Sequence, residues 1–462
     1  MTVKKGSSKW RWSTLGEVCS KPQYGWTTSG ATSGKVKLLR TTDITSGRID
    51  WTDVPFCREE PPEYGKYKLN QNDIVVSRAG SVGVSHLLRN PEEAVFASYL
   101  IRFRPGDSVI PQFVAYFLQS PEYWSQIRSN TAGIAIPNVN ATKLQCIPIP
   151  VPPLDEQRRI VVEIEKQFTR LDAGLASLRR VQNTLKRYRA SVLKAACEGR
   201  LVSTEAELAR RDNRSYQTGE QLLQRILKGR RERWNGKGKY KEPIAPGPLS
   251  NVDLPEGWAW TGFEQLADGT KHAIKAGPFG SSLKKSVYTP SGFKIYGQEQ
   301  VIRGNPYFGD YFISRELFEQ LRSCEAKPGD ILVSLVGTAG KVLILPDDSV
   351  PGIINPRLLK LSLNRSGVNL KFIKILLESS AARAFFKLAA HGGTMEILNL
   401  GILKAFPVPL PPLSEQTRIV AEVERRLSVV DELELAVTTN FQHTSALRRS
   451  ILKRAFTEPK RR

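Results

Sequence analysis

Residues that could catalyse a reaction are few and widely separated in this chain. Four histidines show no HExxH arrangement and no metal-ligand spacing; they are His86, His272, His391 and His443. The segment VGTAGKV (336–342) ends in Gly-Lys, but it lacks the first glycine of a phosphate-binding loop and the Ser or Thr that would follow Lys341. No GxSxG nucleophile motif is present. The sequence therefore predicts neither a catalytic residue nor a metal site.

Two further segments fall short of enzyme motifs. NPRL (355–358) differs from the Asn-Pro-Pro-aromatic arrangement with which amino methyltransferases hold a flipped base. PDD (346–348) lacks a following Glu-x-Lys at nuclease spacing. No cofactor fingerprint occurs, so we expect this chain to bind no cofactor itself.

Polar side chains on loops beside strand ends are typical of surfaces that read base edges and phosphates, and both halves of the chain carry such loops. In the first half the candidates lie in and around 24–30, 38–48 and 77–81; they are Tyr24, Trp26, Lys35, Arg40, Thr41, Thr42, Asp43, Arg78 and Ser81. In the second half they lie in 275–286, 296–304 and 337–341; they are Lys275, Ser281, Ser282, Lys284, Lys285, Gln298, Gln300, Arg303 and Lys341. Taken singly, each is more often an ordinary surface residue. Together they predict one scaffold with two different DNA-reading surfaces.

The charge of the chain favours the same partner. Among 462 residues, 68 lysines and arginines stand against 45 aspartates and glutamates, a formal net charge of +23. Clustered positive charge gains by displacing counterions from phosphate, so double-stranded DNA is favoured over an anionic membrane or mere solubility.

The cysteines and the apolar runs indicate a compartment. Five cysteines show no CxxC spacing, which predicts a reducing environment; they are Cys19, Cys57, Cys146, Cys197 and Cys324. The first residues carry no apolar core of a signal peptide, and about 18 consecutive apolar residues occur nowhere. We expect a cytoplasmic protein with no membrane partner.

A proline-rich junction occurs twice. IPIPVPPLDEQRRIVVEIE (147–165) matches FPVPLPPLSEQTRIVAEVE (406–424), an offset of 259 residues from Pro148 to Pro407. Within small insertions the offset holds elsewhere, since NDIVVSRAGSVG (72–83) matches GDILVSLVGTAG (329–340) and RASVLKAAC (189–197) matches RRSILKRAF (448–456). We interpret this pattern as an internal duplication.

Each repeat begins with a mixed α/β segment and continues as one long helix. Short apolar runs that end in Gly-rich turns predict strands, and apolar residues spaced by three and four predict helices. The prolines suit the approach to a helix, and Asp155 and Ser414 stand where they could cap its first free amides. The predicted order is an α/β domain at 1–150, a helix at 151–200, a basic linker with a short helix at 201–250, an α/β domain at 251–409 and a helix at 410–458. The linker is expected to be largely solvated.

Both helices carry a narrow apolar seam of the coiled-coil kind. In the first helix the seam is Ile160, Ile164, Phe168, Leu171, Leu175, Leu178, Leu185, Tyr188 and Val192. In the second it is Ile419, Val423, Leu427, Val430, Val437, Phe441 and Ile451, with Glu434 and Thr444 interrupting the middle. Each helix could pack on its own domain. About 45 helical residues extend about 65 Å, farther than such a domain is wide, so packing of the helices on each other is favoured.

The predicted fold class therefore combines two α/β domains with long helices in an internally duplicated chain. Chain direction makes the helices antiparallel, with one globular domain at each end of a pseudo-twofold dumbbell.

The repeated α/β domain plus helix, with PIPVPPLDEQRRIV and PVPLPPLSEQTRIV at the junctions, resembles the specificity subunit of Type I restriction-modification enzymes. The linker and the segment KAGPFGSSLKK (275–285) are also similar to members of that family. The resemblance implies two target recognition domains, each binding one half of a bipartite, asymmetric DNA site. It implies helices that fix the spacer between the halves and dock partner subunits.

The resemblance also implies the chemistry of the partners. Two modification subunits would supply S-adenosylmethionine and adenine methylation, and two restriction subunits would supply magnesium- and ATP-dependent translocation and cleavage. The chain itself would be noncatalytic. Two other hypotheses stay open: a self-sufficient nuclease or methyltransferase built from two catalytic halves, and a coiled-coil scaffold for protein partners only.

Overall fold

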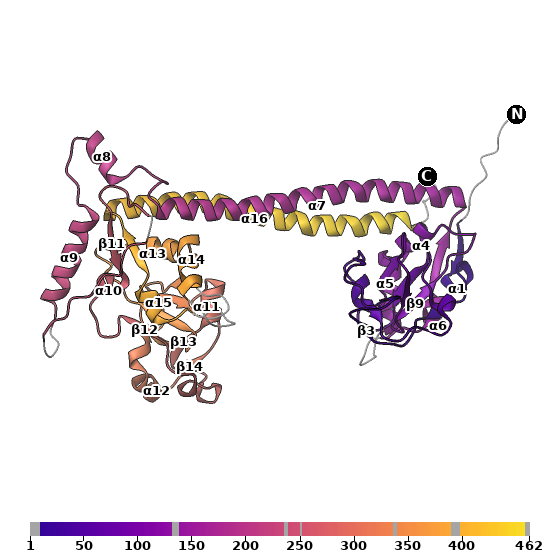
Figure 1. Ribbon diagram of the computed structural model, residues 1–462, viewed down its shortest axis with the longest axis horizontal. Coiled ribbons are helices and arrows are strands. Elements are labelled where there is room, and N and C mark those ends of the chain that lie inside the picture. The colour runs from indigo at the N-terminus through magenta and orange to yellow at the C-terminus, as the bar shows by residue number, and fades with distance from the viewer. Residues whose placement is uncertain are drawn as a thin grey trace. The chain divides into compact units, whose positions relative to one another are not determined.

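The computed structural model describes residues 10–131, 138–234, 239–249, 252–335, 340–389 and 398–457. Contacts divide the chain into two compact units. The first unit contains residues 1–181 and 436–462, and the second contains residues 182–435. Each unit holds one α/β domain together with parts of both long helices (Figure 1).

The first domain is built on two four-stranded sheets. The antiparallel sheet has the order β2 (Gln23–Tyr24), β9 (Leu100–Phe103), β6 (Ile74–Ser77) and β7 (Ser85–Leu87). The other sheet has the order β3 (Gly30–Ala31), β5 (Phe56–Cys57), β4 (Lys37–Leu39) and β8 (Ala94–Phe96), and β4 and β8 run parallel. The helices of this domain are α1 (Leu15–Val18), α2 (Thr41–Ile44), α3 (Tyr64–Tyr67), α4 (Pro111–Phe117), α5 (Pro121–Thr131) and α6 (Ala141–Gln145).

The second domain repeats this plan. Its antiparallel sheet has the order β12 (Ile274–Ala276), β19 (Leu358–Leu361), β16 (Ile331–Ser334) and β17 (Val342–Ile344). Its other sheet has the order β14 (Phe312–Ile313), β13 (Phe293–Tyr296), β18 (Gly352–Ile354) and β15 (Glu325–Ala326), with β13 and β18 parallel. Its helices are α10 (Phe263–Leu266), α11 (Gln298–Arg303), α12 (Arg315–Gln320), α13 (Leu370–Leu377), α14 (Ser380–Ala389) and α15 (Leu400–Lys404), with short 3-10 turns η1 (Gly280–Ser282), η2 (Lys285–Val287) and η3 (Arg322–Cys324).

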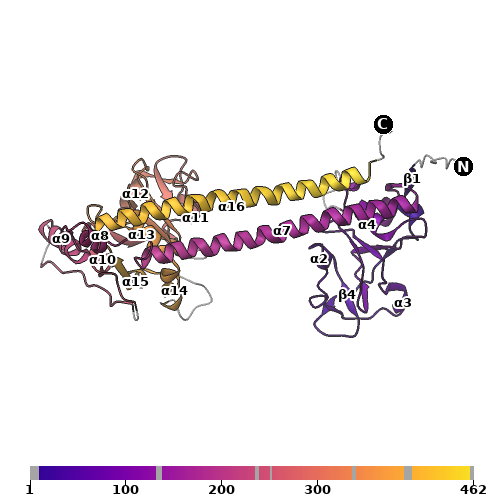
Figure 2. The ribbon, with the colours of Figure 1, turned by 90° about the horizontal axis from the view of Figure 1, so that it is seen from above.

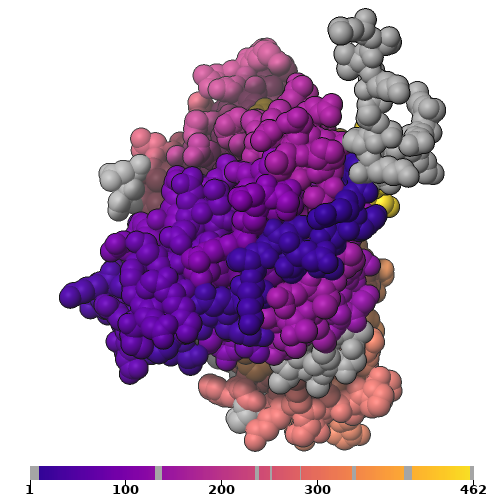
Figure 3. Space-filling view, turned by 90° about the vertical axis from the view of Figure 1, so that its right-hand side faces the viewer, coloured from indigo at the N-terminus to yellow at the C-terminus, as the bar shows by residue number. Residues whose placement is uncertain are grey.

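The repeated junction fastens each long helix to its own domain. Strand β1 (Arg11–Thr14) pairs with the proline strand β10 (Pro148–Val151), and β11 (Ala259–Gly262) pairs with β20 (Pro407–Leu410). In Figure 3 the indigo amino-terminal segment lies across the purple surface of the first domain. Just before these strands, the indole N–H of Trp10 donates to Glu156 Oε1 (3.1 Å), and that of Trp258 donates to Glu415 Oε1 (2.9 Å).

One buried glutamine completes each junction. The Gln157 amide accepts from the Ile110 N–H (2.9 Å) and donates to the carbonyls of Ser108 (3.1 Å) and Pro152 (2.9 Å). Gln416 bonds the second domain in the same way, to the N–H of Asn369 and to two carbonyls. A polar group removed from water is stabilised only when its hydrogen bonds are made, and both amides meet that condition.

The long helices α7 (Leu154–Cys197) and α16 (Leu413–Ala455) are antiparallel where they pack (Figure 2). In the first unit Ile164 and Phe168 of α7 share a core with Leu452 and Phe456 near the end of α16. In the second unit Val192, Leu193 and Ala196 near the end of α7 share a core with Ile419, Val420 and Val423 near the start of α16.

Each helix also packs on a domain. Phe456 lies 5.1 Å from Phe113 of α4, measured between ring centroids, and Phe168 lies 5.7 Å from Tyr116. Helix α16 also packs on the domain of its own repeat, since Val420 and Val423 share a core with Phe372 and Ile375 of α13. Both predicted modes of helix packing are thus present. The predicted fold class, two α/β domains and long antiparallel helices in a duplicated chain, is confirmed.

Nearly all predicted seam residues are removed from solvent. Eight are buried: Ile164, Phe168, Leu185, Val192, Ile419, Val423, Val430 and Val437. Seven are partly buried: Ile160, Leu171, Leu175, Leu178, Leu427, Phe441 and Ile451. Tyr188 is 43% exposed and lies at the margin of the seam, where its side chain hydrogen-bonds Arg426 of α16. After Leu185, the next α7 residue in the seam is Arg189. Arg189 forms ion pairs with Glu434 (3.2 Å) and Asp431 of α16, so it provides a partner for Glu434, the polar residue that interrupts the apolar seam of α16.

Two other expectations need correction. Helices α7 and α16 begin at Leu154 and Leu413, so Asp155 and Ser414 lie inside the first turn and are not the N-caps. The linker is less solvated than expected: its helices are α8 (Glu205–Arg211) and α9 (Gly219–Glu232), and Leu222, Leu223 and Ile226 of α9 are buried in the core of the second unit. The amphipathic pattern of the linker predicted the helix α9, but it did not predict that the apolar face of α9 packs on the core of the second unit.

Among the residues placed by the structure, no helix is long and apolar enough to cross a membrane. The same residues include no group of three or more His, Cys, Asp or Glu side chains arranged to hold a metal ion.

Candidate nucleic-acid interface

The first domain gathers its predicted DNA-reading segments at one end of a parallel strand pair. The carboxyl ends of β4 and β8 lie side by side, as in open α/β sheets whose ligands bind at this edge. The turn at 97–99 follows β8 and joins the segments. It accepts a hydrogen bond from the N–H of Arg78 (2.9 Å) and donates to the carbonyls of Trp26 (2.9 Å) and Leu39 (2.9 Å). We call this region the first strand-end surface; its residues are Tyr24, Trp26, Arg40–Asp43, Arg78 and 97–99.

Side-chain contacts order part of this surface. The Arg78 guanidinium lies 5.0 Å from the ring centroid of Tyr24. Arg40 pairs with Asp43 through Nη2 (2.8 Å) and Nε (3.1 Å), and this hydrogen bonding raises the pKa of Arg40. The ring centroids of Trp26 and Tyr67 lie 5.5 Å apart. The cations and aromatic rings are therefore held in place before any ligand arrives.

Three buried polar atoms here lack a partner in the described part of the chain: Thr41 Oγ1, Arg78 Nε and Asn138 Oδ1. Asn138 belongs to the same region because it forms a β-bridge with Ala79. Buried polar groups of this kind need hydrogen-bond partners, which ordered water or a polar ligand can supply.

The second domain has an equivalent region. Asn355 follows β18, and two glycines pack closely against it. A Cβ added to Gly277 would lie 1.9 Å from the backbone carbonyl oxygen of Asn355, and a Cβ added to Gly297 would lie 2.9 Å from its side-chain Nδ2. The N–H of Leu335 donates to the carbonyl of Arg357 (3.0 Å), the counterpart of the Arg78 to Tyr99 bond. We call this region the second strand-end surface; its residues are 277–285, 297–298 and 355–357.

The other predicted residues are placed as follows. Gln300 is buried, and its amide bonds Gly297 N (2.9 Å) and Phe308 O (2.8 Å), so it stabilises α11 rather than facing a ligand. Lys35 precedes the amino end of β4, at the opposite end of that strand from Arg40. The Arg303 guanidinium stacks 4.1 Å from the Phe308 ring centroid.

The remaining polar candidates lie on loops and turns. Ser81, Ser282, Lys284 and Lys285 are exposed, and Lys275 lies in β12, opposite Lys360. Lys341 is exposed and follows a stretch outside the described residues, 336–339; the side chain of Ser281 is also outside them.

Sequence reasoning missed the two turns on which the segments converge. Tyr99, 61% exposed, and the exposed Arg357 occupy equivalent positions in these turns. No local motif marks them. Parallel pairing of β4 with β8 and of β13 with β18 could have indicated the shared edge, but the paired residues are 57 and 58 positions apart in the sequence (Lys37 with Ala94, Lys294 with Gly352).

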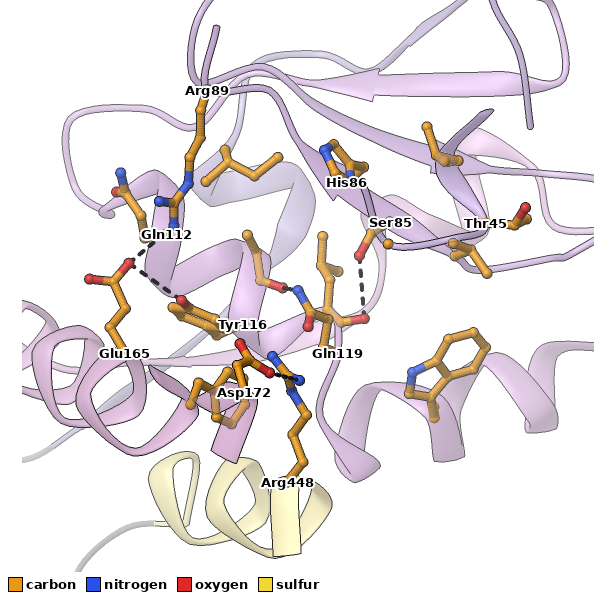
Figure 4. Close-up of a pocket in the computed structure, with 18 of the residues that line it drawn as sticks. Thr45, Ser85, His86, Arg89, Gln112, Tyr116, Gln119, Glu165, Asp172 and Arg448 are labelled. Carbon is orange, nitrogen blue, oxygen red and sulfur yellow. Dashed lines mark hydrogen bonds and ion pairs between the residues drawn. The ribbon is translucent and has the colours of Figure 1, made fainter. Parts of the chain in front are cut away.

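A cavity of about 650 Å³ lies between the first domain and the long helices of the same unit (Figure 4). Its wall holds two polar clusters. Glu165 of α7 accepts from Arg89 (3.1 Å) and Tyr116 (3.3 Å), and Arg448 of α16 pairs with Asp172 of α7 (3.0 Å).

His86 lies in the same wall. Burial lowers the pKa of His86, and the nearby positive charge of Arg89 lowers it further.

The second unit has a cavity of about 840 Å³ bounded by the equivalent elements, namely β17, α13, α16 and α7. Glu424 pairs there with Lys371 (2.7 Å), and Arg189 pairs with Asp431. Arg189 and Asp431 are the duplicated counterparts of Arg448 and Asp172 at the offset of 259 residues. In both units, an ion pair between an arginine of one long helix and an aspartate of the other thus links α7 and α16.

The duplication corresponds to a known family. The family described as Type I restriction modification DNA specificity domain matches residues 7–186 and 279–436, one segment in each repeat. The chain belongs to this family. DNA specificity within a Type I restriction-modification system is therefore the role of this specificity subunit.

The similarity to known specificity subunits extends over most of this chain. The chain is similar to the Type I restriction enzyme StySPI specificity subunit of Salmonella potsdam, with 24% identity over 91% of this chain and 81% of the relative. It is 22% identical to the EcoKI specificity subunit of Escherichia coli K12, over the same shares of the two chains.

The fold is shared with a solved structure described as the structural basis underlying complex assembly and conformational transition of the type I R-M system. The TM-score is 0.63 at 20% identity, covering 97% of this chain and 98% of the other.

Proposed function

We propose that each α/β domain reads one half of a bipartite, asymmetric DNA site through its strand-end surface. The observation that carries this proposal is that the same three segments meet in both domains. In the first domain they are the loop after β2, the start of α2 and the turn between the two sheets; in the second they are the loop after β12, the start of α11 and the equivalent turn. Equal scaffolds with unequal side chains suit two different half-sites. Rigid strands that present variable loops are a common arrangement for recognition.

The side chains divide by the contacts that they suit. Lys275, Lys284 and Lys285 offer ammonium groups to phosphates, which position a protein on the duplex without reading sequence. Arg78 and Arg357 offer guanidinium groups that can bind a guanine edge in bidentate fashion. In the first domain the unpaired atoms of Thr41 and Asn138 support polar contacts with bases or with ordered water.

The paired helices would set the spacer between the half-sites and dock two modification subunits. Val429 and Leu433 of α16 are 50% and 46% exposed and lie four residues apart, on one face of the helix. An apolar pair left uncovered on a charged helix suits a protein partner.

In the assembled cytoplasmic complex, two restriction subunits would add cleavage. S-adenosylmethionine, ATP and magnesium would be used by the partner subunits, and this chain would contribute specificity without catalysis. Adenine methylation or restriction would thus occur where the two domains place the complex.

Exchange of one domain tests the division between half-sites. Residues 15–147 lie between β1 and β10, so replacing them with the same segment of a related subunit keeps the strand pair and the bond between Gln157 and the Pro152 carbonyl. We expect one half-site to change while the other half-site and the spacer stay the same, as measured by mapping methylated adenines in DNA exposed to the complete complex. A change in both half-sites, or in neither, would contradict the proposal.

A further inference from the structure

Phe279 is 87% exposed on the loop between β12 and η1. All eighteen phenylalanines of the chain lie in described segments, and the other seventeen are buried or partly buried. A phenylalanine side chain exposed to water lacks the hydrophobic stabilisation that buried phenylalanines gain. Phe279 is therefore available to a partner with an apolar surface.

The loop that carries Phe279 is fixed at both ends. On one side, the N–H of Gly277 donates to the carbonyl of Leu358 (3.0 Å), and the glycine leaves no room for a side chain beside Asn355. On the other side, Leu283 is buried in a core of the second domain. Little conformational freedom is lost when such a loop binds, so the ring is preorganised as a projection.

The surroundings of the ring point to a polyanion with apolar faces. Lys284 and Lys285 are exposed a few residues after Phe279, and exposed Arg357 lies in the turn against which Gly277 packs. Stacked bases flanked by phosphates present both features: cations contact the phosphates, and an aromatic or apolar side chain enters between adjacent bases.

We propose that Phe279 is a wedge that enters the base stack of the half-site bound by the second domain and partly unstacks one step. This inference rests on the proposed function, because it assigns a contact within the second strand-end surface. The wedge makes sequence preference depend on how easily a base step is opened, in addition to hydrogen bonding.

At the loop position equivalent to Phe279, the first domain carries no aromatic ring. Gly25 is the counterpart of Gly277, since a Cβ there would lie 2.2 Å from the carbonyl oxygen of Ala97 in the equivalent turn. Two residues after Gly25 stands Thr27, where the second domain has Phe279. The effect of the wedge is thus confined to one half-site, and the other half-site is an internal control.

Selection from randomised duplex DNA tests the wedge, with the full chain and its Phe279→Ala variant compared in parallel. We expect the wild-type chain to retrieve two half-sites, and the variant to lose preference at one or two adjacent positions of one half-site only. Affinity for the wild-type selected duplex should fall about tenfold, the order found when a stacking ring is removed.

Unstacking is then measured directly with 2-aminopurine placed at the affected step of the selected duplex. The wild-type chain and Phe279→Trp should raise its fluorescence, whereas Phe279→Ala should not. Ile244→Ala is the matched control, because Ile244 is 82% exposed in the linker of the same unit and should leave both readouts unchanged.

Two results would overturn the wedge: equal base preference of Phe279→Ala and wild type, or weaker binding by Phe279→Ala with no fluorescence rise in the wild-type complex. Failure of the wild-type chain to select any sequence would instead overturn the proposed function, and the wedge with it.

Discussion

Two buried glutamines, Gln157 and Gln416, hold each long helix to the domain that precedes it. Each amide bonds the backbone just before the domain helix α4 or α13, and each also bonds the proline stretch. The polar pair Glu-Gln after the prolines therefore has a structural reason to occur twice. It fixes the angle at which a helix leaves a domain.

Truncation of one glutamine should loosen that attachment. Gln157→Ala leaves the Ile110 N–H and two carbonyls without partners, and unsatisfied buried groups cost about 1–3 kcal/mol. We expect faster hydrogen exchange of the Ile110 amide and a lower free energy of unfolding for the first unit. Gln167→Ala is the control, because the amide of Gln167 bonds Glu163 one turn earlier on the same helix; equal exchange in both variants would argue against the clamp.

His86 gives the first unit a dependence on pH. Burial lowers its pKa, so the unfolded chain binds this proton more tightly than the folded chain does. The free energy of unfolding should therefore decrease as pH falls through the ordinary histidine value of about 6.5.

Replacement of this histidine removes its share of the pH dependence. We expect His86→Gln to show a shallower loss of stability between pH 7 and pH 5 than wild type, measured by urea unfolding at each pH. His443→Gln, at an exposed position on α16, is the matched histidine replacement with which His86→Gln is compared. An unchanged slope in His86→Gln would contradict the assignment.

At the scale of elements, the helix pair combines an apolar seam with charged closures. Arg448 pairs with Asp172 and stacks 4.1 Å from the ring centroid of Phe168. Arg189 pairs with Asp431 and Glu434 where the seam of α16 turns polar. These partly exposed ion pairs contribute little energy each, but they specify which residues face one another.

The exposed face of α16 formed by Val429 and Leu433 is expected to contact a modification subunit. Leu433→Asp should abolish or weaken co-purification with that subunit while leaving the fold intact, since the side chain is half exposed and a charge there costs far less in the free chain than in a buried interface. Leu435→Asp is the matched control, because Leu435 is 70% exposed and lies about 200° around the helix. Normal assembly of Leu433→Asp, measured by native mass spectrometry, would exclude this face.

At the scale of the whole molecule, the duplication offers a way to alter the proposed spacer. Seven residues correspond to nearly two helical turns, so the seam keeps its phase when a heptad is added to both helices. Inserting one heptad after Leu178 and one after Phe441 lengthens both helices within the first unit by about 10 Å, close to the rise of three base pairs.

We expect the lengthened chain to select the same half-sites with a spacer about three base pairs longer, measured by methylation mapping with the complete complex. Four-residue insertions at the same two points form the comparison, because they rotate the seams by about 40° and should impair helix packing. An unaltered spacer in an assembled heptad variant would exclude the helices as the ruler.

The sequence by itself determined the duplication, the two α/β domains and the two long helices. Repeated residues at a constant offset and long periodic apolar patterns are local features, readable without knowing which surfaces meet. Ile164, Val192, Ile419 and Val423 are buried as their spacing predicted. The loops of both domains were also recognised, because Gly-rich turns after short apolar runs mark strand ends.

Only the tertiary structure decided which of those residues act together. Gln300 has the polarity of a DNA-reading residue but is buried, and Tyr188 has the spacing of a seam residue but is exposed. The turns at 97–99 and 355–357 became central through parallel pairing of strands far apart in the chain. Such placement depends on contacts between distant segments, whereas composition and periodicity record only the preferences of neighbouring residues.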